Sequence, residues 1–385
     1  MEILKEFEGV SALILWSACR DAELCSTPGS RSGLFSSKAA SWNQLIKDEP
    51  SLAPIASELH LLAVCARKHR AAIATACDAI SEWSEGQGKL GTAVEFAQVA
   101  SVVNPACPMY AARTARVLKE RAEWERAANW YDHAIFISRG VEDWHACSDA
   151  YCGLGGLYAE RGRFPRARKL FHRALRAAIR HHNREQVANA YHYLFTLEAV
   201  AGNWARAEEM AMRALRRYPA SSPKRPRLAR DLAYRWILRG YFDRALPLAQ
   251  EVLLHFSAPG LRALVWSDIA RAAAGAGDDE AFERAWAQAR VLLDEGVNGP
   301  YNVTILLNLA HGAAFRGELA RARLPASKAL ELARTRGEPQ SVLEAEALLD
   351  SLKAVFVPQH PPADRGNREI VERVLKLLKD DRAVA

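Results

Sequence analysis

The sequence predicts an all-α protein in which antiparallel helix pairs repeat along the chain. Its 385 residues are rich in alanine, leucine, glutamate and arginine and poor in β-branched side chains, which favours helix throughout. Seven alanines recur at intervals of 34, 40, 40, 38, 36 and 41 residues: Ala93, Ala127, Ala167, Ala207, Ala245, Ala281 and Ala322. In six of the seven segments a glycine stands four or five residues before the alanine. A glycine at that place indicates a tight turn between two helices.

The clearest unit is the segment GLGGLYAERGRFPRARKLFHRAL, residues 153–175. Its small residues, Gly155 and Ala167, are expected to let two helices approach closely, and aromatic side chains fill the space around that contact. Gly162 permits the turn between the helices because it adopts positive φ at little cost. A single hairpin cannot bury both of its faces, so units of this kind must stack into an array.

The pattern resembles the tetratricopeptide repeat (TPR) family over residues 74–336, as about seven repeats. The residues that carry the resemblance in the clearest unit are Tyr151, Leu154, Gly155, Tyr158, Ala167, Phe171 and Ala174. The resemblance implies a right-handed superhelical solenoid of antiparallel helix pairs. The first helix of each pair would line a concave groove, and the second helices would lie outside. The lengthened hairpins look like those of TPR arrays in bacterial regulators and kinesin light chains.

The ends of the chain do not repeat cleanly. Residues 1–73 predict an N-terminal helical cap of degenerate repeat material, which covers the first exposed face of the array. Residues 217–227 contain three prolines. We therefore predict an irregular connector there. Residues 337–357 predict a C-terminal capping helix, and residues 358–385 a linker and an amphipathic helix. The apolar stripe of this last helix, at 368–380, suits either folding back on the solenoid or docking a partner.

Seven cysteines bear on the compartment: Cys19, Cys25, Cys65, Cys77, Cys107, Cys147 and Cys152. Their odd number and the lack of a CxxC pair favour a reducing, cytoplasmic environment. The apolar stretch at residues 10–19 follows an acidic start and is too short to span a bilayer. We therefore expect a buried first helix and no association with membranes.

Motifs of catalysis and metal binding are not found in the sequence. It has no HExxH, GxSxG or Walker motif, and GQGKL at residues 86–90 lacks the serine or threonine that a phosphate loop needs after its lysine. His145, Cys147 and Cys152 lack the fourth ligand of a structural zinc site, and we expect an interhelix loop followed by a packed thiol there. The sequence thus predicts no enzyme, no metal and no cofactor.

Positive charge is concentrated in residues 161–239, which hold 19 lysines and arginines against five acidic residues. This is a balance of 19 − 5 = +14, whereas the whole chain carries +7. On the second helix of the clearest unit, four basic residues follow each other at steps of four, three and four along one face. They form a predicted outer basic ridge: Lys169, Arg173, Arg176 and Arg180.

A second set of residues follows from the resemblance, because it places the first helices in the groove. The residues expected there are Arg116, Lys119, His192, Arg227, Arg230, Tyr234 and His311. Basic residues interleaved with Tyr234 and Trp236 suit an acidic peptide or an acidic protein surface.

These observations predict a non-enzymatic protein–protein interaction scaffold that holds an acidic or extended peptide segment in the groove. One alternative is a regulatory sensor whose groove binds a small peptide or effector. Another is a nucleic-acid-associated regulator in which the basic residues 161–239 contact phosphates. The sequence contains no recognisable base-reading motif, which weighs against nucleic acid. Oligomer formation stays open.

Overall fold

The computed structural model describes residues 2–24, 47, 49–64, 69–294, 301–353 and 368–382. Every element in these ranges is helical, which confirms the all-α prediction. The chain divides into two units, Met1–Leu197 and Glu198–Ala385, and helix α11 (Arg184–Val200) spans the division. Cys25, Cys65 and the predicted linker before residue 368 lie outside the described residues.

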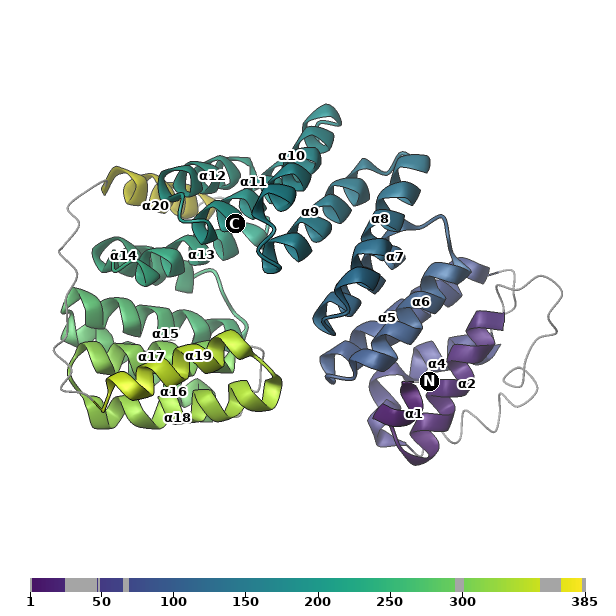
Figure 1. The fold of residues 1–385 in the computed structure, drawn as a ribbon, viewed down its shortest axis with the longest axis horizontal. Coiled ribbons are helices and arrows are strands. Elements are labelled where there is room, and N and C mark those ends of the chain that lie inside the picture. Colours follow the sequence, from purple (N-terminus) through teal and green to yellow (C-terminus); the bar gives the residue numbers. More distant parts are fainter. Residues whose placement is uncertain are drawn as a thin grey trace. The chain divides into compact units, whose positions relative to one another are not determined.

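Unit 1 contains three complete hairpins (Figure 1). They are α5 (Arg70–Gly86) with α6 (Leu90–Val103), α7 (Pro108–Glu120) with α8 (Trp124–Gly140), and α9 (Trp144–Glu160) with α10 (Phe164–Arg180). Each hairpin also packs against the next, since α6 contacts α7 and α8 contacts α9. Successive antiparallel pairs therefore stack as the repeat predicts.

The N-terminal cap consists of α1 (Ile3–Glu6), α2 (Gly9–Leu24), a short 3-10 helix η1 (Pro50–Ile55) and α4 (Ala56–Val64). Helix α2 buries Ile14 and Leu15, as expected for a first helix inside the fold. The Glu6 carboxylate accepts hydrogen bonds from the backbone N–H groups of Gly91 at 2.8 Å and Thr92 at 2.7 Å. The cap thus satisfies two N–H groups that the first turn of α6 leaves without helical partners.

Unit 2 continues the pattern with α12 (Trp204–Arg217), three hairpins and two closing helices. The hairpins are α13 (Lys224–Leu238) with α14 (Phe242–Leu253), α15 (Pro259–Ala276) with α16 (Asp279–Asp294), and α17 (Asn302–Phe315) with α18 (Leu319–Arg336). Helix α19 (Pro339–Ser351) packs on α17 and α18. Helix α20 (Arg368–Arg382) packs on α14 and α12, so the amphipathic segment folds back on the helices of this unit. Val371, Val374 and Leu378 form its buried stripe.

The seven recurring alanines all lie on second helices, and each of them is buried. On the first helix α9, a glycine allows a close approach to the second helix α10. A Cβ built on Gly155 would lie 2.4 Å from a ring carbon of Phe171 on α10. A larger side chain there would push α9 away from α10, so the close approach depends on glycine.

The turns inside the hairpins use one backbone conformation. The six turn glycines have φ between 70° and 81°: Gly88, Gly162, Gly202, Gly240, Gly277 and Gly317. The hairpin of α7 and α8 has Ala122 at this place, with φ 59°. An alanine in the left-handed region is strained because its Cβ approaches the following carbonyl oxygen.

Two local predictions were wrong. Residues 217–227 are an irregular connector only at 218–223, because α13 begins at Lys224 and holds Pro226 in its first turn. A proline is tolerated there, since the first N–H groups of a helix have no intrahelical acceptor. His145 is not in a loop but in the first turn of α9, because the extra residues of these repeats lengthen α8 and α9 to 17 residues each.

Candidate functional site

The first helices of unit 2 lie side by side, because α15 packs on α13 and α17, and α17 packs on α19. A buried carboxylate links three of them. Asp268 on α15 accepts hydrogen bonds from Arg230 Nε at 2.7 Å and Nη2 at 3.1 Å, and from Asn308 Nδ2 at 2.8 Å. Asp268 is 1% exposed and Asn308 is fully buried. Burial raises the pKa of Asp268, and the Arg230 guanidinium opposes that rise.

The linked side chains continue to α19. Arg271 Nη1 donates to Asn308 Oδ1 at 3.1 Å and lies 3.8 Å from Glu344 Oε1. His311 Nε2 lies 3.0 Å from the same Glu344 oxygen. Burial lowers the pKa of His311 despite this hydrogen bond, so we assign a neutral ring that donates from Nε2. We call the six residues Arg230, Asp268, Arg271, Asn308, His311 and Glu344 the polar row.

Tyr234 lies beside the polar row, with the Arg230 guanidinium carbon 4.7 Å from its ring centroid. Arg227 is exposed on α13 and has no ion pair within the described residues. Trp236, which the sequence places among the groove residues, is instead fully buried and donates from Nε1 to Glu208 at 2.7 Å. The sequence-predicted Arg230, Tyr234 and His311 are thus brought together, whereas Trp236 is part of the core.

The first helices of unit 1 carry a second set of pairs. Arg113 Nε lies 2.5 Å from Asp78 Oδ1, and Arg116 forms an ion pair with Glu85 across α5 and α7. Lys119 Nζ on α7 lies 2.7 Å from Glu160 Oε1 on α9. The positive charges predicted at Arg116 and Lys119 are therefore matched by acidic side chains of neighbouring helices.

At the end of unit 1, an acidic side chain of one first helix is hydrogen-bonded to uncharged side chains of the next first helix. Asp149 on α9 accepts hydrogen bonds from Gln186 Nε2 at 3.3 Å and Asn189 Nδ2 at 3.1 Å on α11. His192, a predicted groove residue, is half-buried on α11, and its ring centroid lies 6.2 Å from that of Phe195.

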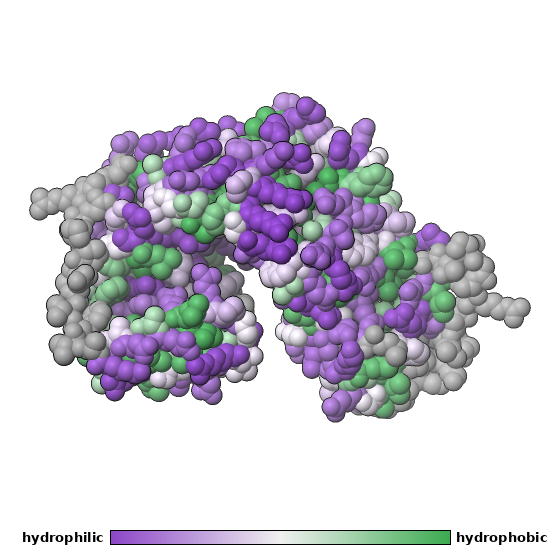
Figure 2. Space-filling model, viewed as in Figure 1, coloured by the Kyte–Doolittle hydropathy of each residue, from purple (hydrophilic) through white to green (hydrophobic). Residues whose placement is uncertain are grey.

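The four residues of the predicted outer basic ridge lie on α10. Lys169, Arg173, Arg176 and Arg180 are exposed, while the opposite stripe of α10 is buried against its neighbours. Hydrophilic side chains cover most of the visible face over α10 (Figure 2). Three ridge arginines border a cavity of about 390 Å³ between α8, α9 and α10. We call this the arginine cavity; Arg139, Arg173, Arg176 and Arg180 line it together with Trp144 and Tyr151.

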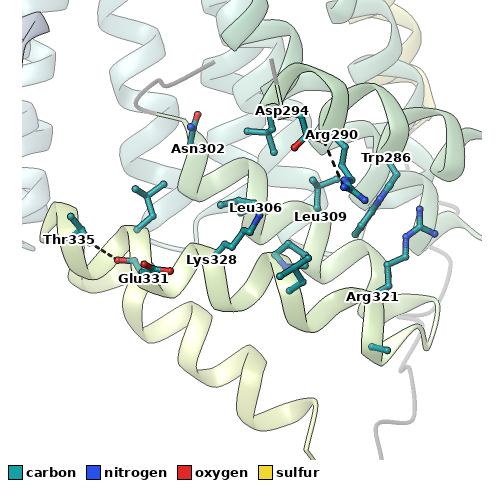
Figure 3. A pocket seen from close by; sticks show the side chains of 15 residues that line it. Trp286, Arg290, Asp294, Asn302, Leu306, Leu309, Arg321, Lys328, Glu331 and Thr335 are labelled. Carbon is teal, nitrogen blue, oxygen red and sulfur yellow. Dashed lines mark hydrogen bonds and ion pairs between the residues drawn. The ribbon is translucent and has the colours of Figure 1, made fainter. Parts of the chain in front are cut away.

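A larger pocket of about 580 Å³ lies between α16, α17 and α18 (Figure 3). Its lining is mainly apolar, with Trp286 at one end and leucines of α17 and α18 along the wall. Arg290 pairs with Asp294 at 3.8 Å, and Arg321 pairs with Glu283 at 2.8 Å. No sequence pattern predicted this pocket, because its lining combines side chains of three helices, α16, α17 and α18.

The described ranges contain neither a cluster of metal-ligating side chains nor a membrane-spanning helix. No three histidine, cysteine or acidic side chains cluster there as metal ligands. No helix in the same ranges is long and apolar enough to cross a bilayer. Cys147 and Cys152 are both buried in α9.

Sequence reasoning missed Asp268, Arg271 and Glu344, although a signal for them exists. Partners in these networks are separated by about one repeat: 38 residues from Arg230 to Asp268 and 40 from Asp268 to Asn308. Adding the repeat period to a charged residue of a first helix therefore indicates its partner on the next one.

Comparison with known proteins supports the repeat assignment. The tetratricopeptide repeat family model matches residues 147–220, which run from α9 through α12. No curated protein matches the sequence.

Three solved structures illustrate the similarity. BtubC (BKLC) from P. vanneervenii has 18% identity and a TM-score of 0.47, covering 55% of this chain and 91% of its own. A Rap protein complexed with Competence and Sporulation Factor has 13% identity and a TM-score of 0.45, covering 89% and 97%. YrrB, a TPR protein with an unusual peptide-binding site, has 20% identity and a TM-score of 0.34, covering 53% and 95%.

The matched segment contains the unit that carries the sequence resemblance, and the flanking hairpins repeat its buried alanine and its turn. Residues 147–220 therefore match the tetratricopeptide repeat family, and the described hairpins on either side continue the same repeat pattern.

Proposed function

We propose that this protein is a non-enzymatic interaction scaffold that binds an extended segment of a partner protein along its first helices. The polar row of unit 2 is the observation that carries the proposal. Six polar side chains from α13, α15, α17 and α19 orient one another through hydrogen bonds. Burying such groups is costly, and packing alone would be served better by apolar residues of similar volume.

Part of the polar row is accessible to a ligand. The side chains of Arg230, His311 and Glu344 remain 16%, 20% and 37% exposed, whereas Asp268 and Asn308 are buried. Arg271 Nε is buried and has no hydrogen-bond partner among the described residues. A ligand would thus meet fixed donors and acceptors whose orientation needs no further ordering.

The charge balance bears on the kind of segment. Arg116, Lys119 and Arg230 all have acidic partners, so the net positive charge at these positions is small. An extended main chain offers alternating N–H and C=O groups and suits a surface with both donors and acceptors. We therefore favour an extended segment recognised through its main chain; the acidic partner stays a prediction.

The test is affinity capture with full-length protein followed by mass spectrometry and peptide mapping of any retained partner. Tyr234→Ala/Glu344→Ala should weaken binding of the mapped peptide by at least about tenfold, since it removes a contact surface and an exposed acceptor. The control is Glu280→Ala/Arg284→Ala on the outer helix α16, an exposed pair that leaves the net charge unchanged. Equal peptide affinity of both double variants would reject the proposal.

A further inference from the structure

The arginine cavity is separate from the first-helix face and does not depend on the function proposed for it. It lies within unit 1, where the second helices α8 and α10 meet the first helix α9. Its volume of about 390 Å³ falls in the range of small-molecule sites. The full lining is Arg139, Trp144, Cys147, Tyr151, Arg173, Arg176, Ala177, Arg180 and His181.

The charge of this cavity is not compensated. None of the nine lining residues is acidic. Within the part of the chain that the structure describes, none of the four guanidinium groups has an ion pair or hydrogen bond. By contrast, Arg113, Arg116 and Arg121 of the same unit each lie close to a glutamate or aspartate. Four guanidinium groups that cannot lose their protons repel one another across a shared cavity until an anion enters.

The placement of the arginines indicates a ligand with several anionic groups. Arg173, Arg176 and Arg180 occupy one face of α10 over about 10 Å, at 1.5 Å per residue. Arg139 approaches from the last turn of α8. A single carboxylate or phosphate is satisfied by one or two guanidinium groups. Four of them, spread along a helix, match a chain of linked phosphates better.

An aromatic wall borders the same cavity. The rings of Trp144 and His181 stack with centroids 4.3 Å apart and planes 4° from parallel. Tyr151 follows two helical turns after Trp144 on α9, and both aromatic side chains are half-buried. Arginines beside aromatic faces form a suitable surface for a planar base next to phosphates.

We propose that the arginine cavity binds a small ligand with two or more linked phosphate groups, either inorganic polyphosphate or a nucleoside polyphosphate. The phosphates contact Arg139, Arg173, Arg176 and Arg180. In the nucleotide case, the base lies against the aromatic wall of Trp144 and His181. This occupant relieves the repulsion between the arginines, which no acidic residue of the lining does.

The test is isothermal titration calorimetry of the full-length protein with tripolyphosphate, ATP and inorganic monophosphate at low salt. Tripolyphosphate and ATP should bind at least about tenfold more tightly than monophosphate, because more guanidinium groups are engaged. Arg173→Ala/Arg176→Ala should weaken both by at least about tenfold. The matched control is Arg163→Ala/Lys169→Ala, which removes two exposed charges at the N-terminal end of α10, where Arg163 is the N-cap residue, but none from the cavity lining.

The two sources of phosphate are separated by Trp144→Leu, with circular dichroism to confirm the fold. If ATP binds more tightly than tripolyphosphate and Trp144→Leu weakens only ATP, by at least about fivefold, the ligand is a nucleotide. Equal affinities that Trp144→Leu leaves unchanged identify inorganic polyphosphate. The proposal is overturned if neither compound binds, or if the control variant loses as much affinity as the cavity variant. Binding of single-stranded DNA alone, with affinity rising with length, would also overturn it in favour of an open nucleic-acid surface.

Discussion

The polar row of unit 2 and the arginine cavity of unit 1 differ in whether their arginines have acidic partners. In the polar row, Arg230 is held by Asp268 through two hydrogen bonds. In the arginine cavity, four arginines meet in one space whose lining contains no acid. The comparison separates two roles of a basic residue. A paired arginine contributes to the fold, and an arginine without a partner is available to a ligand.

The largest expected effect comes from removing the central carboxylate of the polar row. Asp268→Ala removes the buried acceptor of the Arg230 guanidinium and one of the two acceptors of the Asn308 amide, which keeps Ser267. We expect unit 2 to lose about 3–5 kcal/mol of unfolding free energy, as is usual when one partner of a buried ion pair is removed.

The measurement is urea denaturation followed by tryptophan fluorescence. Asp350→Ala is the matched control, because Asp350 pairs with Lys353 on the surface, where both side chains are more than 70% exposed. An exposed pair of this kind contributes at most about 1 kcal/mol. A loss in Asp268→Ala no larger than in Asp350→Ala would remove the structural role of the polar row.

Substitutions at the hairpin turns of unit 1 measure how much an uncharged residue changes its unfolding free energy. Ala122→Gly should stabilise the unit by about 1 kcal/mol, because glycine relieves the strain of positive φ in this hairpin. The reverse change, Gly162→Ala, should destabilise it by a similar amount at an equivalent turn. Thermal unfolding followed by circular dichroism checks both variants. A change of the same sign in both variants, or destabilisation by Ala122→Gly, would show that the two turns are not equivalent.

A smaller effect is expected from placing an acid inside the arginine cavity. Ala177 lines the cavity four residues after Arg173 and three before Arg180. Ala177→Glu should therefore stabilise unit 1 by about 0.5 kcal/mol through helical ion pairs. It should also reduce tripolyphosphate binding in calorimetry, since two arginines become paired. Ala177→Gln keeps the size without the charge; binding reduced equally by both changes would point to steric blocking instead.

The polar row should also respond to pH, by an amount smaller than the loss of Asp268. Burial lowers the pKa of His311 below its ordinary value of 6.5. The unfolded state therefore binds more protons than the folded state just below pH 6.5. The stability from this group is present above that pH and is lost as the pH falls. Denaturation of the wild type and His311→Gln between pH 7.5 and 5.5 should show a shallower decline in the variant, and parallel declines would contradict this assignment.

Much of the fold could be predicted because one packing requirement recurs. A small residue such as Ala167 or Ala207 faces the neighbouring helix in each hairpin, and a turn residue with positive φ, a glycine in all but one case among the seven, precedes it. These constraints act over short sequence distances, so the residues show them directly. The start of α13 was less predictable, since Pro226 is compatible both with a connector and with the first turn of a helix.

The candidate sites were only partly predictable. The basic ridge on α10 follows from spacing within one helix, and the structure has it on the exposed face. The pairing of Arg230 with Asp268 joins residues 38 positions apart, so spacing within a single helix carries no information about it. The arginine cavity likewise needs Arg139 of α8 and Trp144 of α9 beside α10, and only hairpin packing brings them together.

The most direct test of the difference between paired and unpaired arginines uses one substitution in both regions. The unfolding free energies of Arg230→Ala and Arg176→Ala should be measured under the same conditions, without added anions. We predict a loss of about 3 kcal/mol or more for Arg230→Ala, which leaves Asp268 buried without its guanidinium. For Arg176→Ala we predict a change within about 0.5 kcal/mol of the wild type, as for an exposed residue without a structural partner. Equal losses in the two variants would contradict the account.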